Sequence, residues 1–383
     1  MIRNRQISVL NTSFLLGTLG SALVLVPWKL FTQGLSWTEA LVGLGMFFAI
    51  GLSVTAGYHR LFSHRAYQAS WPVRLVFLLF GAAAFQNSAL KWSSDHRVHH
   101  HHVDDLDRDP YVIGKGFWYA HWTWVMEKKD LALEGVADLE KDALVRWQHR
   151  HHFVIGGLVA LLPVWIGLAT GNVLGHLVIG LLLRIVLTHH TTFLINSAAH
   201  VFGSRPYTEA NSARDNWLLA PFTFGEGYHN YHHMWQWDYR NGVRWFQWDP
   251  TKWLLGVLAL TGAVRQLRRV PDTVIRRAKL AMEEKRLAAT LAQAPQNLAA
   301  PLKERLARTR VRLDVALVAL HDRKEAWEER KREWKAKGEA RAEAWRLAKS
   351  EWKAAMAQHQ QELGEAWNEW KAARNEARRL VFA

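Results

Sequence analysis

The chain has 383 residues, a formal net charge of +15, 20 histidines, 21 tryptophans and no cysteine. The absence of cysteine excludes disulfides, thiolate zinc sites, cysteine-ligated iron–sulfur clusters and covalently attached c-type haem, so the protein ligands of any metal must be nitrogen or oxygen. Apolar runs dominate up to about residue 200, whereas the end of the chain is highly charged, which predicts two kinds of structure in one chain.

Four apolar segments are long enough to cross a bilayer as helices, which takes about 20 residues. They cover about 9–30, 38–58, 153–171 and 173–196. The first segment lacks the small-residue cleavage pattern of a signal peptide, so we expect it to be a retained span. The basic residues within 1–5 are typical of a cytoplasmic flank. The apolar run 253–264 is too short to cross and is expected at the surface.

A fifth apolar segment, about 73–90, lies between two groups of histidines. It contains Gln86 and Asn87 and is flanked by Arg74 and Lys91, so we expect it to be re-entrant or interfacial. Four crossings leave every histidine group on one side of the membrane, whereas a fifth would separate them. Lys and Arg at the span ends predict that this side is cytoplasmic and that both termini are inside.

Histidines recur at the ends of these segments with spacings that suit metal binding. The groups are His59/His64, His96/His99/His100 and His229/His232/His233, together with Asn196 and His200. Offsets of three and four residues place imidazoles on one face of a helix. One such histidine is more simply explained by a core or interfacial hydrogen bond, but the whole set favours a metal site. Nine histidines exceed the ligands of one ion, so we expect two metal ions, whose identity imidazole alone does not fix.

Three further sets of polar residues have open interpretations. They are His101/His102, Asp104/Asp105/Asp107/Asp109 and His189/His190. The first set either extends the second histidine group or lies in a solvated loop. The carboxylates either accept the second N–H of ligand imidazoles or form an exposed turn. The histidine pair inside the fourth span either supports the ligands, lines a tunnel, or simply packs.

The position of the histidine groups at a membrane boundary, beside apolar segments, favours a lipid substrate. Oxidising an unactivated C–H bond requires a metal or cofactor because side chains cannot do it, and di-iron oxygen chemistry meets both conditions. A related lipid hydroxylase would use the same oxidant, so desaturation and hydroxylation both stay open. A histidine-rich metal transporter fits less well, because transporter ligands lie near the midplane of their spans.

The chain changes character after about residue 270 and becomes rich in Ala, Glu, Lys and Arg. We expect a membrane domain over 1–270, a helix and linker over 271–300 and a long charged helix over 301–383. The motif Glu-Trp-Lys-Ala recurs every 18 residues, at 333–336, 351–354 and 369–372. Eighteen residues make about five helical turns, so the tryptophans form one stripe. We expect this stripe to lie on the membrane, to pair with a second helix, as in an oligomer, or to dock a partner. Of these we favour the membrane-surface or docking role, because Trp prefers interfaces and a basic segment suits an anionic leaflet.

Four stretches carry a resemblance to a known family. They are GYHRLFSHRAY (57–67), FQNSALKWSSDHRVHHHHVDDLDRDPY (85–111), INSAAHVFGSRPY (195–207) and FGEGYHNYHHMWQWDYRNGVRWFQWDPTKW (224–253). They resemble the membrane-bound acyl-CoA desaturases, which insert a cis double bond near carbon 9 of a saturated acyl thioester. The resemblance covers about 10–290. It implies an all-α integral membrane protein with four transmembrane helices and a cytoplasmic histidine-rich di-metal cap, followed here by a long charged C-terminal helical tail.

The family uses two Fe ions, O2 as co-substrate and two electrons from a redox partner. The resemblance implies metal ligands at His59, His64, His96, His99, His100, His200, His229, His232 and His233, with Asn196 bound through a water. It also implies that Gln86, Trp92 and Thr192 line the bend of the acyl tunnel. Asp95 and Arg97 would lie near the thioester and head group.

The expected partners follow from the same resemblance. They are an acyl-CoA or another acyl thioester and the lipid bilayer, but no nucleic acid. Because the chain has no cysteine and no recognisable haem domain, we expect electrons to come from a separate ferredoxin or cytochrome with its reductase.

Overall fold

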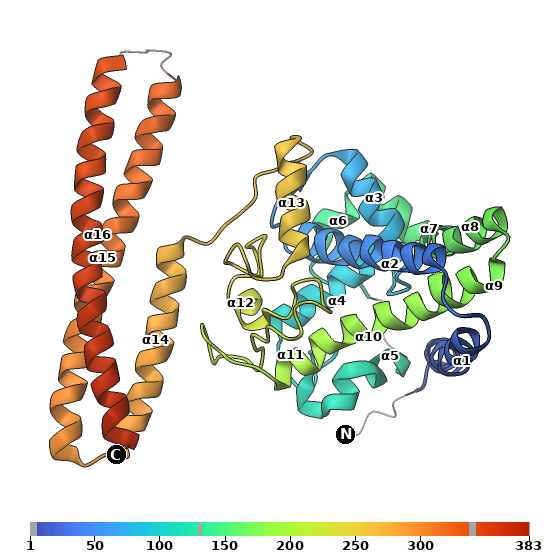
Figure 1. Ribbon diagram of the computed structural model, residues 1–383, viewed down its shortest axis with the longest axis horizontal. Coiled ribbons are helices and arrows are strands. Elements are labelled where there is room, and N and C mark those ends of the chain that lie inside the picture. The colour runs from blue at the N-terminus through green and yellow to red at the C-terminus, as the bar shows by residue number, and fades with distance from the viewer. Residues whose placement is uncertain (1–5, 129–131, 337–341, 383) are drawn as a thin grey trace. The chain divides into compact units, whose positions relative to one another are not determined.

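The computed structural model describes residues 6–128, 132–336 and 342–382, which are mostly helical (Figure 1). The chain forms two compact units. One consists of the residues up to 269 except 206–208, and the other of 206–208 and 270–383. The expected cytoplasmic flank at 1–5 lies outside the described residues.

Among the described residues, four helical segments of the first unit are long and apolar enough to cross a membrane, which confirms the predicted number of spans. The first is α1 (Val9–Gln33), and the second joins α2 (Trp37–Leu52) to the π-helix η1 (Ser53–Ser63). The third joins α7 (Ala143–Ala160) to α8 (Leu162–Thr170). The fourth joins α9 (Val173–Gly175), η4 (His176–Leu183), α10 (Arg184–Asn196) and α11 (Ala198–Val201).

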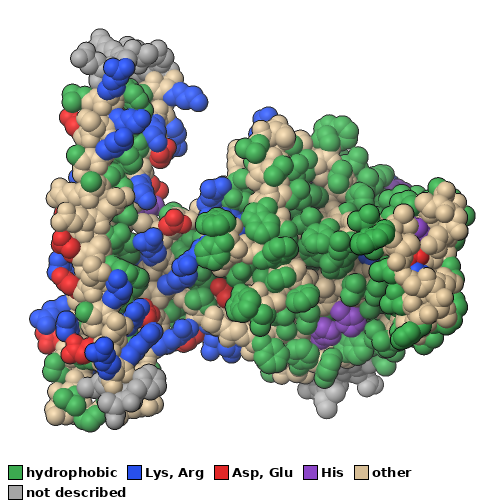
Figure 2. Space-filling model, in the orientation of Figure 1, with side chains coloured by type: hydrophobic (Ala, Val, Ile, Leu, Met, Phe, Trp, Pro, Cys, Tyr) green, Lys and Arg blue, Asp and Glu red, His purple; other side chains and the backbone are tan. Residues whose placement is uncertain are grey.

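The surface of the first unit agrees with a bilayer environment. Large apolar side chains cover much of the face of this unit that Figure 2 shows, whereas many Lys, Arg, Asp and Glu side chains lie on the surface of the second unit. On α1, for example, Leu23, Val24 and Phe31 are 68%, 66% and 91% exposed. A patch of this kind is costly in water but matches lipid tails.

The third span begins earlier than the sequence suggests. Its helix starts at Ala143 rather than at about 153, because Asp142 caps it by accepting bonds from the N–H groups of Leu144 and Val145. The turns that follow contain Arg, Gln and His. Hydropathy alone therefore misses them.

The expected re-entrant segment, 73–90, is a short helix followed by a turn. The helix, α3 (Trp71–Ala82), has 12 residues, so it is about 18 Å long and shorter than the roughly 30 Å of a bilayer core. The chain then passes through Phe85 and Asn87, whose φ angles are 53° and 79°, before α4 (Ala89–His101) begins. Because the segment does not cross, histidines from η1 and α4 can meet.

Two side chains of the fourth span complete the end of α3. Arg184 Nη1 donates to the Ala83 carbonyl and His189 Nε2 donates to the Ala84 carbonyl, each at 2.8 Å. Both side chains are buried. Unpaired carbonyls are costly away from water, and a cation suits the negative end of a helix dipole. These bonds explain how a helix of half the usual length can end inside the unit.

Short elements connect the spans. They are β1 (Gln68–Ala69), η2 (Ile113–Lys115), η3 (Tyr119–Thr123), α5 (Trp124–Met126), α6 (Ala137–Glu140), α12 (His229–Met234), α13 (Pro250–Leu260) and β2 (Val264–Arg265). β1 and β2 pair antiparallel, with Gln68 opposite Arg265. The apolar run 253–264 falls mostly in α13, which contacts η1 and exposes Val257 and Leu260.

The second unit is a bundle of three helices, α14 (Asp272–Leu291), α15 (Gln296–Ala336) and α16 (Ala342–Phe382). Arg312 bonds Glu369 and Arg305 bonds Glu376, each at 2.7 Å, so α15 and α16 run antiparallel. The predicted single helix over 301–383 is therefore wrong. The sequence between the two helices contains no proline, and its one sign of a helix end is Gly338.

The tryptophan stripe faces the interior of this bundle. Trp327 of α15 stacks on Trp345 and Trp352 of α16, with ring centroids 5.2 and 5.0 Å apart. Trp327 and Trp370 are buried. Of the three expected roles, pairing with a second helix is the one that the structure contains, and it occurs within the chain. The role of the outer faces of the tail in oligomerisation or docking stays a prediction.

Replacing Trp370 by Ala should unfold the tail far more readily than replacing Trp367 by Ala. Trp370 is 0% exposed in the core of the bundle and Trp367 is 36% exposed on the same helix. Truncating a buried Trp costs about 3–5 kcal/mol. Hydrogen exchange of α14–α16 in the solubilised protein measures the difference, and equal exchange in the two variants would contradict this packing.

Candidate metal centre

The structure brings all nine predicted histidines together in two groups. The first group is His59, His64, His96, His100 and His232, and the second is His99, His200, His229 and His233. Within each group, one ring nitrogen from each histidine lies within 4.8 Å of those of the others. Seven of the nine side chains are buried, so the two groups belong to the interior of the unit and are not chance clusters on its surface.

Each HxxHH motif contributes to both groups, which the sequence did not predict. On α4, His96 and His100 are four residues apart, share a face and join the first group, whereas His99 joins the second. On α12 the pair four residues apart joins the second group and His232 joins the first. Each group therefore takes histidines from both motifs, and neither motif forms a group by itself.

The first pair of ligands depends on an unusual helix. His59 lies within η1 and His64 is the residue that ends it. The His64 N–H donates to the His59 carbonyl at 3.1 Å, which is the i→i+5 bond of a π-helix. This winding brings residues five apart close together, with ring centroids 4.8 Å apart, whereas an α-helix would place them on different faces.

The spacing of the nitrogens fits metal ions. The Nε2 atoms of His64 and His96 lie 2.8 Å apart, those of His232 and His100 2.9 Å apart, and those of His229 and His200 3.1 Å apart. Two imidazoles bound at right angles to one ion, each at about 2.0–2.1 Å, would have nitrogens about 2.9 Å apart. The approach of several nitrogens to this distance is what a shared ion would produce.

Buried nitrogens without partners give a second test of fit. The Nε2 atom of His99 is buried and has no hydrogen-bond partner, which is costly for a polar atom unless something else binds it. Burial also lowers the pKa of His96, His100 and His232 well below the ordinary value. These rings are therefore neutral at physiological pH, which is the form that binds metals. The residues present fit two metal ions.

Carboxylates and a hydroxyl group orient the ligands from behind. His99 Nδ1 donates to Asp109 at 2.9 Å, and His200 Nδ1 is 2.7 Å from Ser212 Oγ, which in turn donates to Asp104. Partners of this kind fix the ring orientation and raise ligand basicity. Asp105 instead accepts two N–H groups in an exposed turn. Both interpretations of the four carboxylates are thus correct, for different residues.

Glu226 is a supporting residue that the sequence interpretation missed. It accepts a hydrogen bond from His59 Nδ1 at 3.0 Å and from Arg60 Nη2 at 2.9 Å, and it is buried. Burial alone would raise its pKa, but His59 and the Arg60 guanidinium lower the pKa of Glu226 to about 2. No spacing in the sequence linked it to His59, because the two residues are 167 positions apart.

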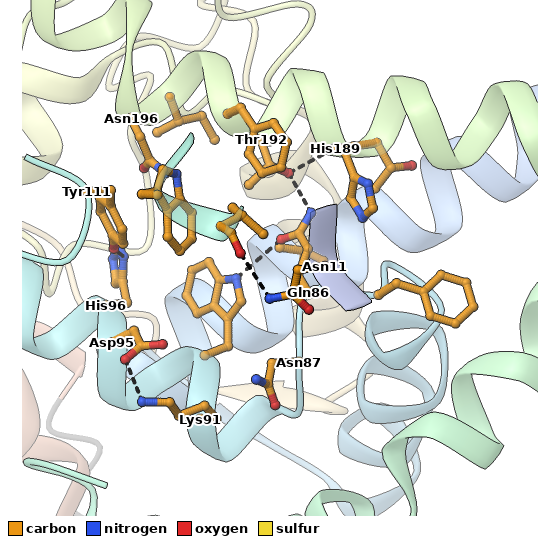
Figure 3. Close-up of a pocket in the computed structure, with 18 of the residues that line it drawn as sticks. Asn11, Gln86, Asn87, Lys91, Asp95, His96, Tyr111, His189, Thr192 and Asn196 are labelled. Carbon is orange, nitrogen blue, oxygen red and sulfur yellow. Dashed lines mark hydrogen bonds and ion pairs between the residues drawn. The ribbon is translucent and has the colours of Figure 1, made fainter. Parts of the chain in front are cut away.

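A cavity of about 740 Å³ reaches the metal centre. His59, His96 and His229 line it, and so do Gln86 and Trp92, two of the residues expected at the tunnel bend. The third, Thr192, lies opposite Gln86 in Figure 3, and Gln86 Nε2 donates to its hydroxyl at 2.9 Å. A cavity of this size is typical of small-molecule sites, which hold about 300–1,000 Å³.

Comparison with known proteins decides the family. The model of the fatty acid desaturase family matches residues 35–265, more than half of the chain. The chain belongs to this family.

Named relatives agree with this assignment. The chain is 40% identical to acyl-CoA desaturase 1 of Saccharomyces cerevisiae over 242 residues, which are 62% of this chain and 47% of that protein. It is 34% identical to stearoyl-CoA desaturase 5 of Bos taurus over 288 residues, 71% of this chain and 83% of that protein. It is 33% identical to acyl-CoA Delta-9 desaturase of Acheta domesticus over 265 residues, 65% and 73% respectively. The match spans about half the length of the Saccharomyces cerevisiae and Schizosaccharomyces pombe relatives.

The remaining residues that the sequence predicted for the site lie in different places. Asn196 and Asp95 line the cavity, and Asp95 bonds Lys91 at 2.9 Å (Figure 3). Arg97 is not among the lining residues. It donates to the Phe62 carbonyl and bonds Asp138, so it ties α4 to the end of η1. The water-mediated role of Asn196 and the head-group roles of Asp95 and Arg97 stay predictions.

The other histidines near the site also differ, because some line the cavity and others do not. His189 lines the cavity, whereas His190 bonds His121 at 3.0 Å and does not line it. His101 and His102 join neither metal group. His101 is exposed at the end of α4 and His102 follows it, which agrees with the solvated-loop interpretation.

Replacing Asp109 by Asn should lower metal affinity about 10–100-fold, because the His99 ring loses the charge that orients it. Glu226→Gln, behind His59, should act similarly. Asp105→Asn is the matched control, since that carboxylate only caps an exposed turn. Metal retained against a series of chelator concentrations measures the affinity, and equal retention in Asp109→Asn and Asp105→Asn would disprove the role assigned to Asp109.

Proposed function

We propose that the protein is an oxygen-dependent acyl desaturase that inserts a cis double bond, at carbon 9, into a saturated acyl thioester at a histidine-bound di-iron centre. The observation that carries this proposal is a single cavity lined both by ligand histidines and by apolar residues of the spans. The ligand histidines in its wall are His59, His96 and His229, and its apolar residues include Leu15 and Val54. Membership of the family supports the reaction class.

A set of bonds across the cavity would hold the acyl chain bent beside the ligands. Trp92 stacks on His96 with ring centroids 4.8 Å apart, and its Nε1 donates to Gln86 at 3.3 Å. Gln86 in turn donates to Thr192 on the fourth span. Because these residues are bonded to one another before any substrate enters, the bend is rigid. A rigid bend presents one pair of neighbouring carbons to the metal centre and favours a cis product.

When bound, the two iron ions supply the activation of O2 by two electrons and two protons, so that one hydrogen leaves each of two neighbouring carbons and two waters form. The chain's own residues bind the substrate and exclude bulk water. Phe85, Val54 and Phe224 line the apolar part of the cavity, where they would hold the hydrocarbon away from water. A hydroxylase would start from the same centre and differ only at the second hydrogen.

The acyl carrier and the position of the double bond are inferred from the relatives. Their names give acyl-CoA as the substrate, with Delta-9, Delta(11) and Delta12 activities. Lys91 and Lys128 line the same cavity as the ligand histidines, and they would suit the phosphates of CoA. We therefore propose acyl-CoA rather than a lipid-bound acyl group.

Purified protein should contain about two irons per chain and, given O2 and electrons, convert a saturated acyl-CoA of about 16–18 carbons to its cis monoene. This ratio follows from the two ligand groups. His232→Ala should abolish activity because it removes a ligand, whereas His102→Ala should not, since His102 joins neither group. Gas chromatography of the products separates a monoene from a hydroxy acid, and a hydroxy acid would favour the hydroxylase.

We also propose that the metal centre and both termini face the cytoplasm, where a separate ferredoxin or cytochrome delivers the electrons. The chain is strongly basic, so an acidic carrier should associate more weakly as the salt concentration rises, because screening shortens the range of charge attraction. Turnover measured against salt with a reconstituted carrier and reductase tests this. Turnover by the isolated chain with NAD(P)H and O2 alone would rule out a separate carrier.

A further inference from the structure

The ring of Phe224 packs closely against Gly51 in the wall of the cavity. A Cβ atom built on Gly51 would lie 2.2 Å from the tip of the Phe224 ring, so only glycine leaves room for the ring there. Both residues line the cavity. Phe224 is 4% exposed, so its ring is a fixed part of the wall.

The lining of the second span ends at this contact. Along the second span, away from the ligand His59, the residues that line the cavity are Thr55, Val54 and last Gly51. The next turn of the helix carries Phe47 and Phe48, whose rings pack on the Phe224 ring with centroids 5.1 and 5.5 Å away. The Phe224 ring therefore stands between the cavity and the continuation of the helix surface. Gly51, where this contact occurs, precedes His59 by eight residues on the same span.

The backbone of Phe224 is anchored to the wall that its ring closes. Its φ angle is 54°, a conformation that bulky residues adopt only when their surroundings enforce it. Thr251 donates to the Phe224 carbonyl at 3.1 Å, and the hydroxyl groups of Thr251 and Thr55 lie 2.7 Å apart. Thr55 is one helical turn from Gly51. The backbone of Phe224 cannot move away from the second span without breaking these bonds.

Two parts of the cavity lining differ in chemistry. Lys91, Asp95 and Lys128 line one part and would suit a polar head group, whereas Gly51, Val54 and Phe224 contribute an apolar part. A hydrocarbon chain whose head is held at the charged part would direct its methyl end into the apolar part.

We propose that Phe224 sets the upper limit on the length of the acyl chain beyond the bend. The inference rests on the proposed function, because it assumes an acyl chain in this cavity. Removing the ring would open the cavity along the second span toward Phe47, so longer chains would fit. Each added methylene that a hydrophobic pocket admits or rejects changes selectivity by about 10-fold or more.

Binding of saturated acyl-CoAs with 16, 18 and 20 carbons to the iron-loaded protein, without an electron donor, tests the proposal. Displacement of a fluorescent acyl-CoA reports each affinity without turnover. Phe224→Ala should raise the ratio of 20-carbon to 16-carbon affinity at least about tenfold. Phe224→Leu, a milder change, should raise it less. Phe222→Ala is the matched control, because Phe222 lies in the same loop but is 60% exposed and does not line the cavity.

The outcomes separate the two proposals. If wild-type protein binds acyl-CoA but both Phe224 variants keep the wild-type ratio, the length limit lies elsewhere and this inference is overturned. The same holds if Phe222→Ala shifts the ratio as much as Phe224→Ala. If wild-type protein binds none of the acyl-CoAs and makes no monoene, the proposed function fails, and the inference fails with it. A product profile that shifts toward longer monoenes in Phe224→Leu would support both.

Discussion

A buried ion pair at Arg60 holds the metal centre together. Arg60 follows the ligand His59 in η1, and its guanidinium bonds Glu226 at 2.9 Å and Asp249 at 3.1 Å. Glu226 lies just before α12, and Asp249 caps α13 by accepting the Lys252 N–H. One side chain thus joins the second span to the loop that carries the third histidine motif. Removing one partner of a buried pair costs about 3–5 kcal/mol, because the other charge is left unpaired.

The second constraint is that, among the described residues, four helical segments are long and apolar enough to cross a membrane, and α3 is not one of them. The short helix α3 ends inside the first unit and returns, so that His64 and His96 come from opposite sides of a hairpin and meet. Arg184 and His189, both on the fourth span, make this possible by binding the carbonyl groups at the end of α3. Polar residues within an apolar span are costly unless they have such a partner. His189 also lines the cavity, so its bond to the Ala84 carbonyl fixes part of the cavity wall.

The sequence predicted those features that depend on length and spacing. Spans are detected by runs of apolar residues, and the nine histidines by their offsets, so both were found. Gln86, Trp92 and Thr192 came from the resemblance, and the structure places them together. The features that the sequence did not predict depend on contacts that the sequence pattern does not reveal. Glu226 has no spacing signature of its own, and the polar turns after Asp142 look like a loop until the cap is seen.

The tail was harder to interpret for a related reason. A stripe of Trp with an 18-residue period has the same appearance whether it meets lipid, a partner or another part of the chain. Trp327 lies between Trp345 and Trp352, and only the fold-back of α16 on α15 reveals that. Local sequence sets the helical face, but the choice of its neighbour is a tertiary property.

The division of each HxxHH motif between two ligand groups has a consequence for how the protein is assembled. A single ion in the first group would draw on η1, α4 and α12 at once. Ordering α4 and α12 for that ion would also position His99, His229 and His233 for the second, so the entropy of arranging the second site would already be spent. We expect uptake to be strongly cooperative. When metal is scarce, such a protein would exist mainly as empty and fully loaded molecules, with few that hold one ion.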